Sequence, residues 1–184
     1  MTDLYRYSNV KELKIKDFDL KKKLKIKDNI INNKNEILIL YTPTCKHCQN
    51  TVYLWDNFIR GIPDWMNDFT SKKNFIVETK DIIIDCDYPN TNYIIHAASI
   101  ASPIFYRKYP LETIFSNITG LKNILDFSIN NKSIDSILFF STSEIYGDPD
   151  NNNIPTKETY RGNVSCTGPR ACYDESKRLG ETLC

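Results

Sequence analysis

The chain has 184 residues, of which 41% are hydrophobic and 26% are charged, with a net charge of +1 at pH 7. This length suits one domain, and this composition excludes a wholly disordered chain. A near-neutral charge argues against a general affinity for nucleic acid. No apolar run approaches the roughly 18 residues that cross a bilayer, and the N-terminus does not read as a secretory signal. We therefore expect a cytoplasmic protein that binds neither nucleic acid nor membrane.

Residues 1–35 form a polar, lysine-rich extension. They hold ten Lys or Arg and five Asp or Glu side chains, which is an excess of five positive charges. Charge runs of this kind are usually solvated, so an exposed extension is expected, with an arm for an acidic partner as the alternative. The composition becomes more apolar from residue 36, and the domain is expected to span residues 36–184.

Short apolar runs in this domain alternate with helical patterns. Strands are predicted at 37–41, 52–55, 75–77, 93–96 and 137–140. Apolar residues recur at helical spacing from Leu111 to Leu125, and a second helix is expected over Asp174–Leu183. Strands that alternate with helices predict an α/β protein with a parallel sheet covered on both faces.

Hydroxyl and carboxylate groups follow the last predicted strand. Thr142, Ser143 and Glu144 stand where parallel sheets bind their ligands. Tyr173 and Lys177 are four residues apart on the second predicted helix and so share one face. An ammonium group beside a phenol lowers the pKa of the tyrosine, which could then take a proton from a sugar hydroxyl while hydride leaves the same carbon.

Three segments resemble a known family: STSEIYGDP at 141–149, ETYRGNV at 158–164 and GPRACYDESKR at 168–178. They are similar to the extended short-chain dehydrogenase/reductases (the NAD-dependent epimerases and dehydratases), and within these most of all to UDP-glucuronate decarboxylases. Weaker likeness reaches back to Val52. The resemblance implies an incomplete Rossmann-like, doubly wound parallel sheet that carries a lysine-rich N-terminal extension.

The resemblance also implies roles for individual residues. Tyr173 is the catalytic base, Lys177 is its partner and a ligand of the cofactor ribose, and Thr142 orients the hydroxyl group. Ser143 and Glu144 act at the sugar ring and its carboxylate, and Asn163 contacts the sugar nucleotide. The implied contacts of the cofactor NAD are, in addition, Asp56, Asp81, Ile82, Ala97, Ala98, Ser99 and Asn117. A carboxylate at Asp56 favours NAD over NADP, because a 2′-phosphate would meet a like charge.

The implied reaction oxidises C4 of UDP-glucuronate, releases carbon dioxide from the resulting β-keto acid and returns the hydride, which gives UDP-xylose. A C4 ketone accepts the electrons that decarboxylation leaves behind, so the cofactor carries the difficult chemistry. The sibling alternative is a sugar-nucleotide 4,6-dehydratase. That reaction needs an acid beside the threonine to protonate the departing hydroxyl group. Ser143 occupies that place, which disfavours a dehydratase, but Glu144 follows it and keeps this alternative open.

The chain departs from the family in two places. No glycine precedes Gly61, so the segment after the first predicted strand lacks the glycine-rich turn that approaches the cofactor pyrophosphate. The chain also ends seven residues after Lys177, whereas family members continue into a substrate-binding part. We therefore expect a truncated enzyme that is inactive alone, with a complementary C-terminal polypeptide or a second copy as partner. A non-catalytic remnant that binds through its open sheet edge is an alternative.

The segment that replaces the glycine-rich turn has its own resemblance. Cys45 and Cys48 stand in TPTCKHCQ after a predicted strand, which is similar to a thioredoxin active-site entry. A thiol–disulfide redox module would need Cys45 at the start of a helix over residues 52–59. His47 could join the two thiols on a metal, but no second Cys or His cluster exists, so no metal site is predicted.

Overall fold

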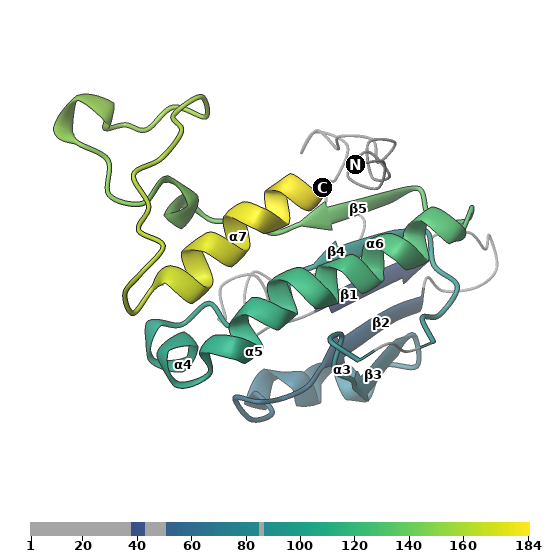
Figure 1. Ribbon diagram of the computed structural model, residues 1–184. Coiled ribbons are helices and arrows are strands. Elements are labelled where there is room, and N and C mark those ends of the chain that lie inside the picture. Colours follow the sequence, from purple (N-terminus) through teal and green to yellow (C-terminus); the bar gives the residue numbers. More distant parts are fainter. Residues whose placement is uncertain (1–37, 43–50, 85–86) are drawn as a thin grey trace.

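The computed structural model describes residues 38–42, 51–84 and 87–184. The predictions for residues 1–35 and for Cys45 and Cys48 lie outside these ranges. One five-stranded sheet, in the order β3-β2-β1-β4-β5, runs through the described part of the chain (Figure 1).

The strands are β1 (Leu38–Thr42), β2 (Thr51–Asp56), β3 (Phe75–Thr79), β4 (Tyr93–His96) and β5 (Ser136–Phe139). All five lie where apolar runs predicted them. β2 pairs in parallel with β3, with Val52 opposite Phe75, and β4 pairs in parallel with β5, with Ile94 opposite Ile137. The parallel prediction is therefore confirmed for these two pairs.

The prediction of a wholly parallel sheet is wrong at β1. This strand is antiparallel to both of its neighbours, and Leu38 lies opposite Trp55 of β2 and His96 of β4. Only residues 43–50 link β1 to β2, and a parallel neighbour needs a crossover of about a dozen residues or more. Because β1 runs the other way, its carboxyl end lies at the opposite edge of the sheet from those of the other four strands.

The longer helices are α4 (Pro103–Lys108), α5 (Pro110–Phe115), α6 (Leu121–Asn130) and α7 (Ala171–Leu183). A π-helical segment, η3 (Ser116–Gly120), joins α5 to α6 where one helix was predicted. Short helical turns are η2 (Asp64–Met66), α3 (Asn67–Thr70), η4 (Ser143–Tyr146) and η5 (Asn151–Asn153). No helix in the described ranges is long and apolar enough to cross a membrane.

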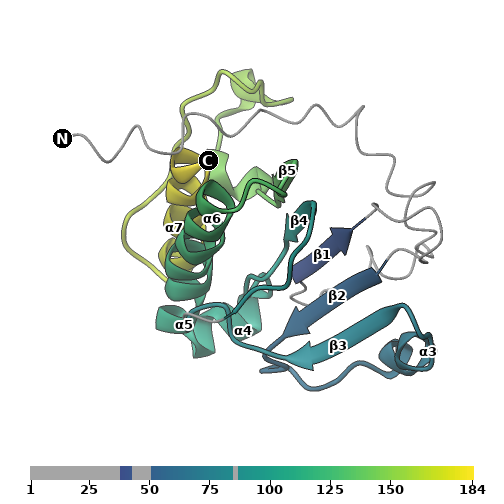
Figure 2. The same ribbon diagram turned by 90° about the vertical axis from the view of Figure 1, so that its right-hand side faces the viewer.

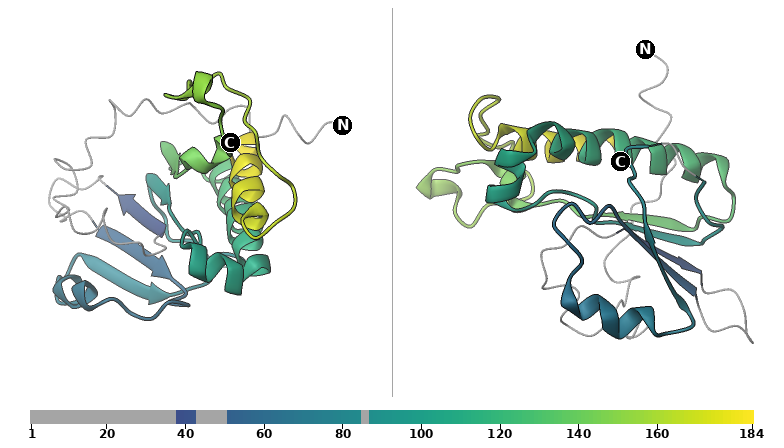
Figure 3. Two further views of the ribbon diagram at one scale, coloured as in Figure 1. Left: turned by 90° about the vertical axis from the view of Figure 1, so that its left-hand side faces the viewer. Right: turned by 90° about the horizontal axis from the view of Figure 1, so that it is seen from below.

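Helices lie on both sides of the sheet, as predicted. α6 and α7 run side by side along one face (Figure 2), while η2 and α3 lie on the other (Figure 3, right). Under α6, the spacing of Leu121, Ile124 and Leu125 directs three fully buried side chains towards Ile94 of β4. On the opposite face Met66 packs with alternate residues of β2.

Candidate active site

One edge of the sheet collects the ends of four strands. β2, β3, β4 and β5 all run in the same direction, so their carboxyl ends meet there. Asp56 ends β2, Asp81 follows β3, Ser99 follows β4 and Thr142 follows β5. Ligands of open α/β sheets bind outside this edge. The structure thus brings residues expected at the cofactor and residues expected in catalysis to the same edge.

Tyr173 sits near the start of α7 and is 7% exposed. Its ring stacks on that of Tyr106 of α4, with ring centroids 5.4 Å apart and planes inclined by 10°, and Ile100 completes the cluster. The hydroxyl group of Thr142 lies near enough to the phenol to lower its pKa through hydrogen bonding. The threonine that follows β5 and the tyrosine on α7 therefore lie close together, whereas no sequence pattern indicated the stack on Tyr106.

Burial raises the pKa of Tyr173 above its ordinary value of 10, and the hydrogen bond from Thr142 only partly opposes this. The ammonium nitrogen of Lys177 lies 5.9 Å from the centre of the Tyr173 ring. The expectation that Lys177 lowers the pKa of this phenol towards neutrality is therefore wrong for the free chain, because desolvation outweighs the nearby positive charge.

Lys177 is 2% exposed and is fixed between α7 and β5. Its ammonium group donates a hydrogen bond of 2.7 Å to the carbonyl oxygen of Phe140 and lies 4.9 Å from the centre of the Phe139 ring. His96 contacts the same ring edge to face, with ring centroids 5.6 Å apart. Burial, and then the charge of Lys177, lower the pKa of His96 to about 3, so this imidazole is neutral at physiological pH.

Thr142 also begins η4, because its side-chain oxygen accepts a hydrogen bond of 3.3 Å from the N–H of Glu144. The Glu144 carboxylate forms an ion pair with Arg170, which also bonds to Asp174 at 3.3 Å (Nε to Oδ2). Ser143, between them, is exposed. Arg170 thus holds Glu144 at the start of α7. The four-residue spacing of Arg170 and Asp174 is the signal that could have indicated it.

Asn163 lies in the loop before α7 and is bonded to the segment that follows η4. Its N–H donates to the carbonyl oxygen of Tyr146 at 2.9 Å, and its side-chain amide donates to that of Asp148 at 3.0 Å. Gly147 has a φ of +68°, and a Cβ there would lie 2.1 Å from the Asn163 carbonyl oxygen. Asn163 is therefore placed beside η4, which carries Ser143 and Glu144.

The residues expected at the adenosine end of NAD lie after β2 and β3. Asp56 is 8% exposed, and its Oδ1 accepts a hydrogen bond of 2.7 Å from the N–H of Phe58. Burial raises the pKa of Asp56 to about 6, against the opposing effects of the Phe58 bond and of the charge on Arg60. Asn57 donates to the Asp81 carboxylate at 3.2 Å, which joins the two strand ends.

The remaining residues expected to contact the cofactor lie after β3, after β4 and in η3. The hydroxyl oxygen of Ser99 is buried and has no hydrogen-bond partner among the described residues. Ile82 lies so close to η3 that a Cβ at Gly120 would be 2.5 Å from it. Asn117 of η3 is fully buried and donates to the Ser176 hydroxyl at 2.8 Å, beside Lys177 on α7. Ala97 and Ala98 pack against the clusters on opposite faces of the sheet.

These residues fit a dinucleotide along the carboxyl edge. An acidic group at the end of β2 suits the hydroxyl groups of a ribose, and the unpartnered Ser99 hydroxyl offers a further contact. β1 runs in the opposite direction to the other four strands, so among the described residues its carboxyl end is not at the edge where the ends of β2, β3, β4 and β5 meet. The described part of the chain holds no group of three or more His, Cys, Asp or Glu side chains that could bind a metal ion.

The helix expected over residues 52–59 for a thioredoxin-like entry is wrong. Residues Thr51–Asp56 form β2, whose pairing with β1 and β3 fixes them as a strand. The helix start that would stabilise a Cys45 thiolate is therefore not formed by this segment.

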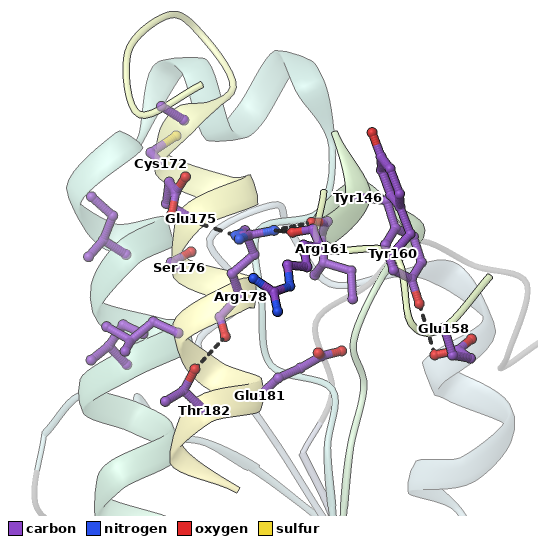
Figure 4. Close-up of a pocket in the computed structure, with 15 residues that line it drawn as sticks. Tyr146, Glu158, Tyr160, Arg161, Cys172, Glu175, Ser176, Arg178, Glu181 and Thr182 are labelled. Carbon is purple, nitrogen blue, oxygen red and sulfur yellow. Dashed lines mark hydrogen bonds and ion pairs between the residues drawn. The ribbon is translucent and has the colours of Figure 1, made fainter. Parts of the chain in front are cut away.

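A groove of about 800 Å³ runs along the outer face of α7 (Figure 4). One side is formed by Ile114 and Ile118, and the other by Tyr146 and Tyr160. Tyr173 and Lys177 do not line it, because Tyr173 packs on Tyr106 of α4 and Lys177 bonds to the carbonyl oxygen of Phe140. The groove is thus separate from the groups expected to act in catalysis.

Comparison with known proteins identifies relatives. A family model described as the NAD dependent epimerase/dehydratase family matches residues 79–184. UDP-glucuronic acid decarboxylase 6 of Arabidopsis thaliana is 38% identical over 136 residues, which cover 73% of this chain and 38% of that protein. UDP-glucuronic acid decarboxylase 1 of Danio rerio is 38% identical over 130 residues, covering 70% of this chain and 30% of that protein. The chain thus spans 30–38% of the length of these relatives.

Proposed function

The chain belongs to the NAD dependent epimerase/dehydratase family, and from that membership we propose that it carries the catalytic end of an enzyme that converts UDP-glucuronate to UDP-xylose. The family predicted from residues 141–178 is thereby confirmed. The observation that carries the proposal is the contact between Thr142 and Tyr173, with Lys177 on the same face of α7.

NAD, when bound, supplies the acceptor and later the donor of a hydride. In the proposal the C4 hydroxyl group of the sugar lies between Thr142 and Tyr173, where Thr142 orients it and Tyr173 takes its proton as C4 becomes a ketone. Lys177 keeps a positive charge near the phenol that loses its proton. Because burial raises the pKa of Tyr173 in the free chain, Tyr173 needs further positive charge in the bound state to act as a base.

Glu144 and Ser143 are proposed to act where the carboxylate leaves. They follow Thr142 directly and lie on η4, so a sugar held at Thr142 presents its ring to them. The ketone at C4 accepts the electron pair released with carbon dioxide, after which C5 takes a proton and C4 takes back the hydride. Asn163 is proposed to contact the sugar nucleotide from the neighbouring loop.

We expect NAD to bind weakly to this chain. The residues at the ends of β2, β3 and β4 are present, but no glycine follows β1 before Gly61, and the carboxyl end of β1 lies at the opposite edge from theirs. We therefore propose that the described residues bind part of NAD and transfer the proton. Decarboxylation needs the complete active site, including the support for the pyrophosphate.

A fluorescence titration of the full chain with NADH tests the proposal. Saturable binding that Lys177→Ala weakens and that Lys132→Ala, a change at an exposed lysine, leaves unchanged would support it. The same samples would then be assayed for carbon dioxide release from UDP-glucuronate. A folded chain that does not bind NADH at millimolar concentration would overturn the proposal.

A further inference from the structure

Arg178 joins three separate segments of the chain through one nitrogen atom. It lies on α7, directly after Lys177, and its Nη1 donates to the carbonyl oxygen of Ile145 at 2.6 Å and to that of Arg161 at 3.2 Å (Figure 4). The two hydrogens of this nitrogen are thus used on two different segments. The Nε of the same side chain lies 3.9 Å from a carboxylate oxygen of Glu175, which orients the guanidinium group.

The backbone at Gly162 makes room for this contact. Gly162 has a φ of +92°, and a Cβ there would lie 2.6 Å from Nη1 of Arg178 and 3.0 Å from the carbonyl oxygen of Ile145. A side chain at this position would push the guanidinium group away from both carbonyl groups, and the left-handed backbone is strained for any other residue. The hydrogen bonds of Arg178 therefore require a glycine at position 162.

The segments that Arg178 joins carry the groups of the proposed reaction. Ile145 belongs to η4, which holds Ser143 and Glu144. Arg161 lies two residues before Asn163, and α7 itself holds Tyr173 and Lys177. We propose that Arg178 is a positioning residue that fixes η4 and the 158–164 loop against α7, an inference that rests on the proposed function.

An arginine suits this task better than a lysine. A guanidinium group is planar and presents its N–H donors in fixed directions, so it can reach two carbonyl groups at a set angle. The site lies at the wall of the α7 groove, where water competes with weaker bonds. Backbone bonds join Asn163 to Tyr146 and Asp148, so the two segments are already paired with each other, and Arg178 is the residue that ties this pair to α7.

Amide hydrogen exchange on the full chain tests the proposal. In Arg178→Ala we expect the amides of Gly147, Asp148 and Asn163 to exchange about tenfold faster or more, because they bond within the two segments that lose their anchor. The amides of β4 and α6 should keep their rates. Arg107→Ala, at an exposed arginine of α4, is the matched control and should leave every rate unchanged.

Two results would overturn the proposal: unchanged exchange at Gly147, Asp148 and Asn163, or faster exchange throughout α6 and β4, which would mark a general loss of stability. Arg178→Lys keeps a positive charge and one donor direction and should restore part of the protection.

A comparison of the affinities for UDP-glucuronate and for NADH tests the functional consequence. Arg178→Ala should weaken binding of UDP-glucuronate about tenfold and leave NADH affinity unchanged, since Lys177 is held by its own hydrogen bond to Phe140 and the other proposed NAD contacts lie outside the two segments that Arg178 joins. Equal losses of both affinities would count against a positioning role. A wild-type chain that binds neither ligand overturns the proposed function, while the exchange experiment still decides whether Arg178 holds the two segments.

Discussion

The ammonium group of Lys177 donates a hydrogen bond of 2.7 Å to the carbonyl oxygen of Phe140, the residue that follows β5. This bond fixes the middle of α7 to the chain just before Thr142. The lysine expected to assist Tyr173 is thus also a structural link between the helix and the strand that carry the two hydroxyl groups of the site.

Lys177→Ala should therefore lower stability as well as NADH affinity. The side chain is buried, and its loss leaves the Phe140 carbonyl group without a charged donor. We expect the free energy of unfolding to fall by about 2 kcal/mol, as measured by urea denaturation. Lys132→Ala should change it by less than about 0.5 kcal/mol. Equal effects of the two changes would show that the Phe140 bond contributes no stability.

Tyr173 should remain a neutral phenol throughout the physiological pH range in the free chain. Burial raises its pKa above 10, and Lys177 does not reverse this. NMR of a chain labelled with ¹³C at tyrosine Cζ should show one resonance, absent from Tyr173→Phe, that has not moved at pH 9. A shift of that resonance near pH 7 would contradict the structure. Tyr173→Phe keeps the ring that stacks on Tyr106, so its fold should be unchanged.

The sequence predicted the elements of this fold more successfully than their directions. Each strand has a continuous apolar run, and the helix over Leu111–Leu125 has a clear period, so both are local signals. Strand direction depends on the length of the connection, and residues 43–50 are too few for a crossover. The prediction of a parallel sheet came from the alternation of strands with helices along the chain, and this pattern does not hold for the short connection between β1 and β2.

Some features of the candidate site could also be predicted from the sequence, and others could not. Thr142 and Tyr173 could be paired from sequence because each stands at a fixed place on a strand or helix, and the structure brings them into contact. Arg178 could not be foreseen, because its partners are backbone carbonyl groups that carry no residue-type signal. The pKa of Tyr173 also depends on its burial against Tyr106, a contact between distant segments.

Asp56 should reduce stability at neutral pH. Its pKa is about 6 in the folded chain against an ordinary value of 3.8, so between these two values the folded chain binds more protons than the unfolded chain. The free energy of unfolding therefore falls as pH rises through this range and stays lower above it. This is the expected cost of keeping a carboxylate where a ribose would bind.

Asp56→Asn tests this cost, because the amide oxygen can still accept the N–H of Phe58. At pH 7 the variant should be more stable by about 1–3 kcal/mol, from about 1.4 kcal/mol per pKa unit. At pH 3.5 the two chains should unfold at the same urea concentration. A variant that is less stable at pH 7 would show that the Asp56 carboxylate is stabilised by contacts that outweigh its burial. NADH affinity should fall in the same variant.

Gly147 and Gly168 form a matched pair for the loop that places Asn163. Both have a positive φ, of +68° and +106°, but a Cβ at Gly147 would lie 2.1 Å from the Asn163 carbonyl oxygen, whereas at Gly168 nothing lies within 4 Å. Gly168→Ala should cost about 1–2 kcal/mol of backbone strain. Gly147→Ala should cost about 2 kcal/mol more, because the loop must also move away.

Thermal unfolding of the two variants measures that difference, since each variant places a side chain at a positive φ. Gly147→Ala should also speed amide exchange at Asn163, whose N–H bonds to Tyr146, while Gly168→Ala should not. Equal losses of stability in the two variants would mean that the 158–164 loop does not restrict the space for a side chain at Gly147. In that case the close approach to Gly147 would not be what holds Asn163 beside η4, and the hydrogen bonds of Asn163 to Tyr146 and Asp148, together with Arg178, would place it there.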